Sequence, residues 1–264
     1  MSLLSREIEL YDFTRGTRHW RYTDIDRPAI VEGQTYDVAL GLKRSRIMQS
    51  PEESKNNIEI TAPLTLPVLD LWRPFPPMAR VHLQVRRVRV SDGLITDAWS
   101  GIVSDVEEDD HTATMRCQTL MAAVGANGLR RCWQVRCPLA LYGVGSGACG
   151  VREDDFRTES VATFAAGNVV RAAEYAAHPD GYYDGGFIRW TIDGDVDYRF
   201  IVSHVGDTLT LLTPMAFPAG TATSTFPGCD HTLTTCDVKF GNAPNYGGQH
   251  TIPTKNPFSN DPVF

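Results

Sequence analysis

The chain has 264 residues, a hydrophobic content of 42%, a charged content of 22% and a formal net charge of −7. This length supports one large domain or two modest ones. The acidic balance argues against non-specific binding to nucleic acid, which requires a basic surface. The chain contains no run of about twenty apolar residues for a membrane helix, and charges come too early for a signal peptide. We therefore expect a chain that folds in a reducing cytoplasm, without a membrane segment.

The first part of the chain is expected to be rich in β-structure. Short aromatic and β-branched runs, broken by Gly and Asp, predict early strands. These runs are residues 8–13, 19–24 and 34–40. Ile58 and Ile60 alternate with polar neighbours, which indicates a half-buried strand. The proline-rich residues 73–81 predict a connecting loop, because proline cannot donate to a β-ladder.

A long hairpin is predicted over residues 81–109. Its apolar phase slips at Arg86–Arg87, which suggests a bulge, and the Ser-Asp-Gly sequence at 91–93 marks its turn. A further strand follows from residue 111. Its alternation places Ala113, Met115 and Cys117 on one face, so we expect Cys117 in the core.

The second part of the chain has shorter and less regular patterns. Residues 126–150 are rich in glycine and read as an irregular loop, and residues 171–177 as a short helical turn or a loop. Short strands are predicted over residues 187–193, 198–205 and 208–214. The last 40 residues are rich in Gly, Pro, Asn and Thr, a poor composition for a core. We expect a metal cluster or a neighbouring subunit to hold them in place.

The six cysteines are the main chemical signal: Cys117, Cys132, Cys137, Cys149, Cys229 and Cys236. Eleven residues separate Cys137 from Cys149, and six separate Cys229 from Cys236, all in Gly- and Pro-rich sequence. Four loop cysteines without a histidine at finger spacing suit a tetrahedral zinc or an iron–sulfur cluster. The open spacing favours the cluster, because zinc ligands usually lie two to four residues apart within a pair. Cys132 is a possible substitute ligand, or packs beside Trp133.

No catalytic arrangement is visible, and we expect the protein not to be an enzyme. Ser146 lies in a Gly-Val-Gly-Ser-Gly run that departs from the nucleophile-elbow pattern. The seven histidines are scattered and form no zinc-protease motif. The acidic runs 107–110 and 154–155 are typical of solvated turns.

Three parts of the sequence resemble a family of phage and gene-transfer-agent tail proteins. Residues 129–151, with Cys-Pro, Leu-Tyr and Cys-Gly-Val elements, resemble the start of that family's C-terminal domain. The end, CDVKFGNAPNYGGQHTIPTKNPF, is similar to its signature of Cys, Phe-Gly-Asn, Tyr/Phe-Gly-Gly and Asn-Pro. Arg46, SPEESKNNIEITAP and WSGIVSDVE are similar to its first domain, so the resemblance spans nearly the whole chain.

The family includes the tail-tip protein of lambda-like phages, whose C-terminal domain is associated with a four-cysteine iron–sulfur cluster. The resemblance implies a cluster, [4Fe–4S], on Cys137, Cys149, Cys229 and Cys236. It also implies a structural hub of a long non-contractile tail, a homotrimeric ring between the distal tail protein and the central fibre or spike protein. Such a hub belongs to the virion and is assembled in the host cytoplasm. DNA would pass through the ring without specific binding.

The expected fold is therefore mainly β. A β-barrel or sandwich hub domain is expected over residues 1–125, and a loop-rich β domain that holds the metal cluster over residues 126–264. Two alternatives remain open: a zinc-stabilised β module that binds a partner, and a redox-sensing iron–sulfur protein.

The basic residues Arg86, Arg87 and Arg89 are expected at subunit contacts of the ring. Arginines facing the channel would retain the DNA by pairing with its phosphates. We expect them to pair instead with acidic groups such as the Glu107–Asp110 run.

Overall fold

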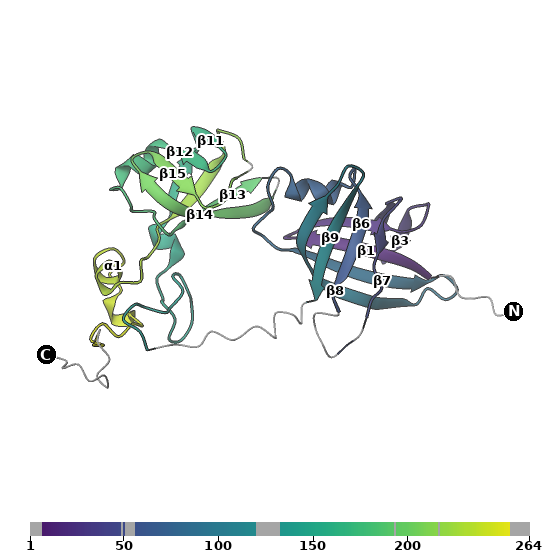
Figure 1. Ribbon diagram of the computed structural model, residues 1–264, viewed down its shortest axis with the longest axis horizontal. Coiled ribbons are helices and arrows are strands. Elements are labelled where there is room, and N and C mark those ends of the chain that lie inside the picture. The colour runs from purple at the N-terminus through teal and green to yellow at the C-terminus, as the bar shows by residue number, and fades with distance from the viewer. Residues whose placement is uncertain are drawn as a thin grey trace. The chain divides into compact units, whose positions relative to one another are not determined.

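The computed structural model describes residues 7–48, 50, 56–119, 133–192, 194–215 and 217–253. The described chain is mainly β, as expected, with one sheet of nine strands and one of seven (Figure 1). It divides into two compact units. The first is Met1–Asn127 with Thr191–Asp197, and the second is Gly128–Trp190 with Tyr198–Phe264.

The nine-stranded sheet has the order β3-β4-β2-β1-β7-β8-β9-β6-β5. Its strands are β1 (Glu7–Arg15), β2 (Arg18–Thr23), β3 (Ala29–Val31), β4 (Gln34–Val38), β5 (Lys43–Arg44), β6 (Ile58–Pro63), β7 (Val81–Arg89), β8 (Ile95–Glu108) and β9 (Thr112–Thr119). The pairs are antiparallel except for β2 with β4. The sheet is curved into a half-barrel whose edges are β3 and β5 (Figure 1). The short 3₁₀ helix η2 (Pro67–Trp72) adds Val68 and Leu69 to its core.

The core of this sheet follows the period of two that the sequence predicts. Ile58 pairs with Cys117 and Ile60 with Met115 across β6 and β9, and all four are buried. This confirms the predicted core position of Cys117, where burial raises the pKa of the thiol to about 12. The register of β7 against β8 shifts between Val85 and Arg86, which confirms the predicted bulge.

The seven-stranded sheet has the order β10-β16-β13-β14-β15-β12-β11. Its strands are β10 (Thr158–Val161), β11 (Phe164–Ala166), β12 (Val169–Arg171), β13 (Phe187–Ile192), β14 (Asp195–Val205), β15 (Thr208–Leu211) and β16 (Ala222–Phe226). The last three predicted strands are thus confirmed as β13, β14 and β15. Residues Ala173–Ala177 form a 3₁₀ helix, η5, so the alanine-rich segment is a helical turn.

Hydroxyl groups in the core of the seven-stranded sheet are paired with one another. Ser160 donates to the Tyr175 hydroxyl at 3.0 Å, and Tyr183 donates to the Thr158 hydroxyl at 2.8 Å. The Tyr175 and Tyr183 rings meet edge to face with centroids 5.6 Å apart. Because buried polar groups are costly when unpaired, these bonds fix the orientation of both rings.

A substitution at Ile60 tests the packing in the core of the nine-stranded sheet. Replacing fully buried Ile60 by Ala should lower the free energy of unfolding by about 2–5 kcal/mol, because a cavity replaces packed methyl groups. Hydrogen exchange of the β6 and β9 amides would measure the loss of stability in these two strands. Ile30, which is 76% exposed, provides the control as Ile30→Ala. Equal exchange in the two variants would show that Ile60 does not support this core.

Candidate metal centre

The four predicted ligand cysteines line one pocket of the second unit. Cys137, Cys149, Cys229 and Cys236 share this pocket with apolar side chains and with two asparagines. Those neighbours are Leu139, Leu141, Val151, Phe240, Asn242 and Asn245, and His231 and Thr232 complete the lining. Each of the four is a free thiol, and Cys149 and Cys236 are buried. The fold therefore brings together residues that lie up to about a hundred positions apart in the sequence.

A close crossing of two chain segments sets the position of Cys229. Gly186 precedes β13 and Gly228 follows β16, and these two strands pair. A Cβ atom on Gly186 would lie 2.0 Å from the Phe226 carbonyl oxygen, and one on Gly228 would lie 2.1 Å from the Asp184 carbonyl oxygen. Only glycine permits this approach, so Cys229 leaves the sheet at a fixed point.

The backbone of His231 links two of the cysteine loops. Its N–H donates to the Cys229 Sγ at 3.3 Å, and its carbonyl accepts from the Cys137 N–H at 2.9 Å. Both bonds depend on a left-handed conformation with φ of +63°. This conformation is uncommon for any residue other than glycine. The structure thus assigns His231 a backbone role beside the thiols.

Cys236 lies on a short helix that the sequence analysis missed. Helix α1 spans Leu233–Val238 and begins at Thr232, whose hydroxyl accepts from the Thr235 N–H at 3.2 Å. Gly241, with φ of +59°, follows its end. The threonine cap and the terminal glycine are the local signals for this helix, although the overall composition reads as loop. This short helix places Cys236 in the lining of the thiol pocket.

The Phe-Gly-Asn and Tyr-Gly-Gly elements of the resemblance both contact the thiol pocket. Asn242 donates through Nδ2 to the Cys149 carbonyl at 2.8 Å and approaches the Cys149 Sγ at 3.7 Å. The Gly247 N–H donates to the Cys137 Sγ at 3.3 Å. Tyr246 donates its hydroxyl hydrogen to the Val135 carbonyl at 2.7 Å. These contacts explain physically why such residues accompany the cysteines.

Two of the four thiols have a raised pKa. Burial raises the pKa of Cys229, and burial together with the other three sulfurs raises the pKa of Cys236 to about 11. A bound cation reverses this preference, because it stabilises thiolates. The N–H groups that already point at Cys137 and Cys229 would stabilise sulfur carrying negative charge. The donor set therefore fits a thiolate-bound metal group.

The spacing of the side chains bears on the size of that group. Among the described residues, no three His, Cys, Asp or Glu side chains converge closely enough to hold a single metal ion. A tetrahedral zinc with Zn–S bonds of about 2.3 Å needs sulfurs about 3.8 Å apart. A cluster spreads its thiolates further apart, because each one binds a different iron.

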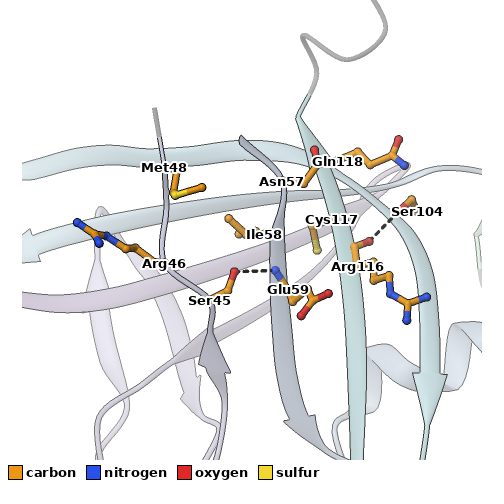
Figure 2. A pocket seen from close by; sticks show the side chains of 10 residues that line it. All are labelled: Ser45, Arg46, Met48, Asn57, Ile58, Glu59, Ser104, Arg116, Cys117 and Gln118. Atoms are coloured by element: carbon orange, nitrogen blue, oxygen red, sulfur yellow. Dashed lines mark hydrogen bonds between the residues drawn. The ribbon is translucent and has the colours of Figure 1, made fainter. Parts of the chain in front are cut away.

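The remaining cysteines are not part of this pocket as described. Cys132, the possible substitute ligand, lies outside the described residues. Cys117 lies in the first unit and lines a hollow that Figure 2 shows with Ser45, Glu59 and Ser104 around it. None of the residues lining that hollow is a second cysteine or a histidine.

The expected partners of the three arginines need correction. The described carboxylates that bind them are Glu32 for Arg86, Glu9 for Arg87 and Asp92 for Arg89. Glu107 and Glu108 pair instead with Arg116 and Arg73. The register decides this, because β1 places Glu9 directly opposite Arg87. A role of these arginines at subunit contacts stays a prediction.

Comparison with known proteins identifies the first part of the chain. Residues 9–152, more than half of the sequence, match the family model described as "Baseplate hub protein, N-terminal attachment domain". The chain belongs to this baseplate hub family. Residues 181–256 match a second family, described as "Phage conserved hypothetical protein BR0599". The resemblance to phage hub proteins is therefore confirmed.

Two relatives extend this comparison of the hub chain. An uncharacterized protein of Xylella fastidiosa (strain 9a5c) is 27% identical over 161 residues, which cover 55% of this chain and 33% of that protein. The chain thus spans about a third of that relative's length. A chain in the virion of a native gene transfer agent (GTA) particle has the same fold, with a TM-score of 0.78 and 18% identity. That match covers 96% of this chain and 90% of the other. In the part of the hub chain that the structure describes, no helix is long and apolar enough to cross a membrane.

Variants at His231 test its backbone role. His231→Gly should retain metal binding, because glycine adopts the left-handed conformation without strain, whereas His231→Val should lose most of it. Metal content per chain, measured after purification without oxygen, distinguishes the two. Loss of metal in the glycine variant would show that the imidazole itself is a ligand.

Proposed function

We propose that this chain is a structural component of the distal end of a long non-contractile phage tail, a baseplate or tail-tip hub. The observation that carries this proposal is the match of residues 9–152 to the attachment domain of baseplate hub proteins. The fold shared with a chain of a gene transfer agent virion supports it. A structural rather than catalytic role agrees with both findings.

The proposed position is between the distal tail protein and the central fibre or spike protein. The chain would associate with copies of itself in a threefold ring there, as the family resemblance implies. It would be assembled in the host cytoplasm and remain in the virion. The nine-stranded sheet has two short edge strands, β3 and β5, with three and two residues. Short edges limit unwanted strand pairing, which suits a protein that is stored before assembly.

We further propose that the second unit holds an iron–sulfur cluster, [4Fe–4S], on Cys137, Cys149, Cys229 and Cys236. The shared pocket and the N–H groups directed at sulfur support this proposal. When bound, the cluster would supply four iron–thiolate bonds that join the loops.

The cluster's proposed role is structural, because the surrounding chain has little core of its own. The hydrophobic cluster beside the thiols contains three buried residues, Cys149, Val151 and Phe240. Metal binding in such a segment contributes directly to folding, since the site does not exist in the unfolded chain. The residues themselves direct backbone N–H groups at the sulfurs and exclude water with Leu139, Leu141 and Phe240.

Spectroscopy and iron analysis test the cofactor. Protein purified without oxygen should absorb broadly near roughly 400 nm and contain about four irons per chain. Cys236→Ser should remove most of the iron, whereas Cys117→Ala, which alters a buried thiol of the other unit, should retain it. About one zinc per chain and no colour would replace the cluster with a tetrahedral zinc site.

Genetic deletion tests the hub role separately. Particles made without this chain should have tails that lack their distal structure in electron micrographs, and they should not infect or transfer DNA. Expression of the intact chain in trans should restore the tip. Normal tail ends on particles without the chain would refute the hub assignment, whatever the metal content of the protein.

A further inference from the structure

A half-buried lysine lies beside the thiol pocket with only uncharged partners. Lys239 follows α1, and its ammonium donates to the Gly228 carbonyl at 2.8 Å and to the Tyr182 carbonyl. The same group lies over the Tyr182 ring, 4.6 Å from the centroid, and over the Phe240 ring at 5.4 Å. Two segments of the second unit thus hold the ammonium in a fixed place.

No described carboxylate forms an ion pair with Lys239. Removing an ammonium from water is costly, and carbonyl dipoles and ring faces offset part of that cost for this half-buried side chain. A negative charge placed beside the ammonium would therefore be stabilised.

The ammonium lies next to the thiol pocket. Gly228, which accepts from the ammonium, immediately precedes Cys229, and Phe240, whose ring it contacts, lines the pocket. Four thiolates around a cluster core carry a net negative charge, so loading the site places an anion beside the ammonium.

We propose that Lys239 is the counter-cation of the metal centre. This inference rests on the proposed iron–sulfur cluster. The fixed ammonium offsets the negative charge of the loaded site. Its hydrogen bonds to the Tyr182 and Gly228 carbonyls also connect the end of α1 to the segments before β13 and after β16. Because a positive charge stabilises the more negative redox state, Lys239 raises the reduction potential of the centre.

Two substitutions separate this electrostatic role from simple packing. Lys239→Arg keeps the positive charge, and Lys239→Gln keeps N–H donors but removes the charge. Lys43→Met, which removes a lysine from β5 of the other unit, controls for net charge. The full-length chain, purified without oxygen, is compared by midpoint potential in mediated titrations and by the rate of iron loss to a chelator.

The charge role predicts different outcomes for the two variants. Lys239→Gln should shift the midpoint potential to more negative values and lose iron about 10–100 times faster, the usual cost of losing support around a metal site. Lys239→Arg and Lys43→Met should stay near the original protein. Equal behaviour of the Gln and Arg variants, whether both unchanged or both impaired, would overturn the inference. If the unsubstituted protein contains no iron, the cluster proposal is overturned as well.

Discussion

The left-handed backbone of His231 is the constraint on which the thiol pocket depends. One residue connects the Cys229 loop to the Cys137 loop, through its N–H on one side and its carbonyl on the other. The glycine crossing at Gly186 and Gly228 fixes where this connection begins. The Tyr246 hydroxyl, which donates to the Val135 and His231 carbonyls, links the same two loops. The remaining contacts from Asn242 and Gly247 reinforce an arrangement that the backbone has already set.

The two units use different means of stabilisation. The first buries apolar side chains in two clusters, one that includes Tyr11 and Val85 and one that includes Leu10 and Val88, and its polar groups form ion pairs along the strands. This is sufficient for a domain of its size. The second has a comparable sheet but also carries a lobe with three buried residues around the thiols. The proposed metal group would add most to the stability of a lobe with so small a core.

The sequence predicted regular elements where the alternation of apolar and polar residues matched the period of a strand. Ile58, Ile60 and Cys117 alternate with polar neighbours, so their strands and their burial could be inferred directly. Helix α1 was missed because its composition is typical of loops, and only the Thr232 cap and Gly241 indicate its ends. The partners of Arg86, Arg87 and Arg89 were also mispredicted. Proximity along the hairpin suggested one set of acids, whereas the pairing of β1 with β7 supplied another.

By itself, the sequence determined the mainly β class, the principal strands and the choice of four cysteines as a set. These properties follow from residue type and spacing, which act locally. Tertiary structure decided that Cys137 and Cys229 share one pocket, that Gly247 directs its N–H at a sulfur, and that the Lys239 ammonium bonds to the carbonyl of the residue before Cys229. Such features require segments about a hundred residues apart to meet at defined angles. Long-range register and close backbone approach set those angles, and neither is encoded in any local pattern.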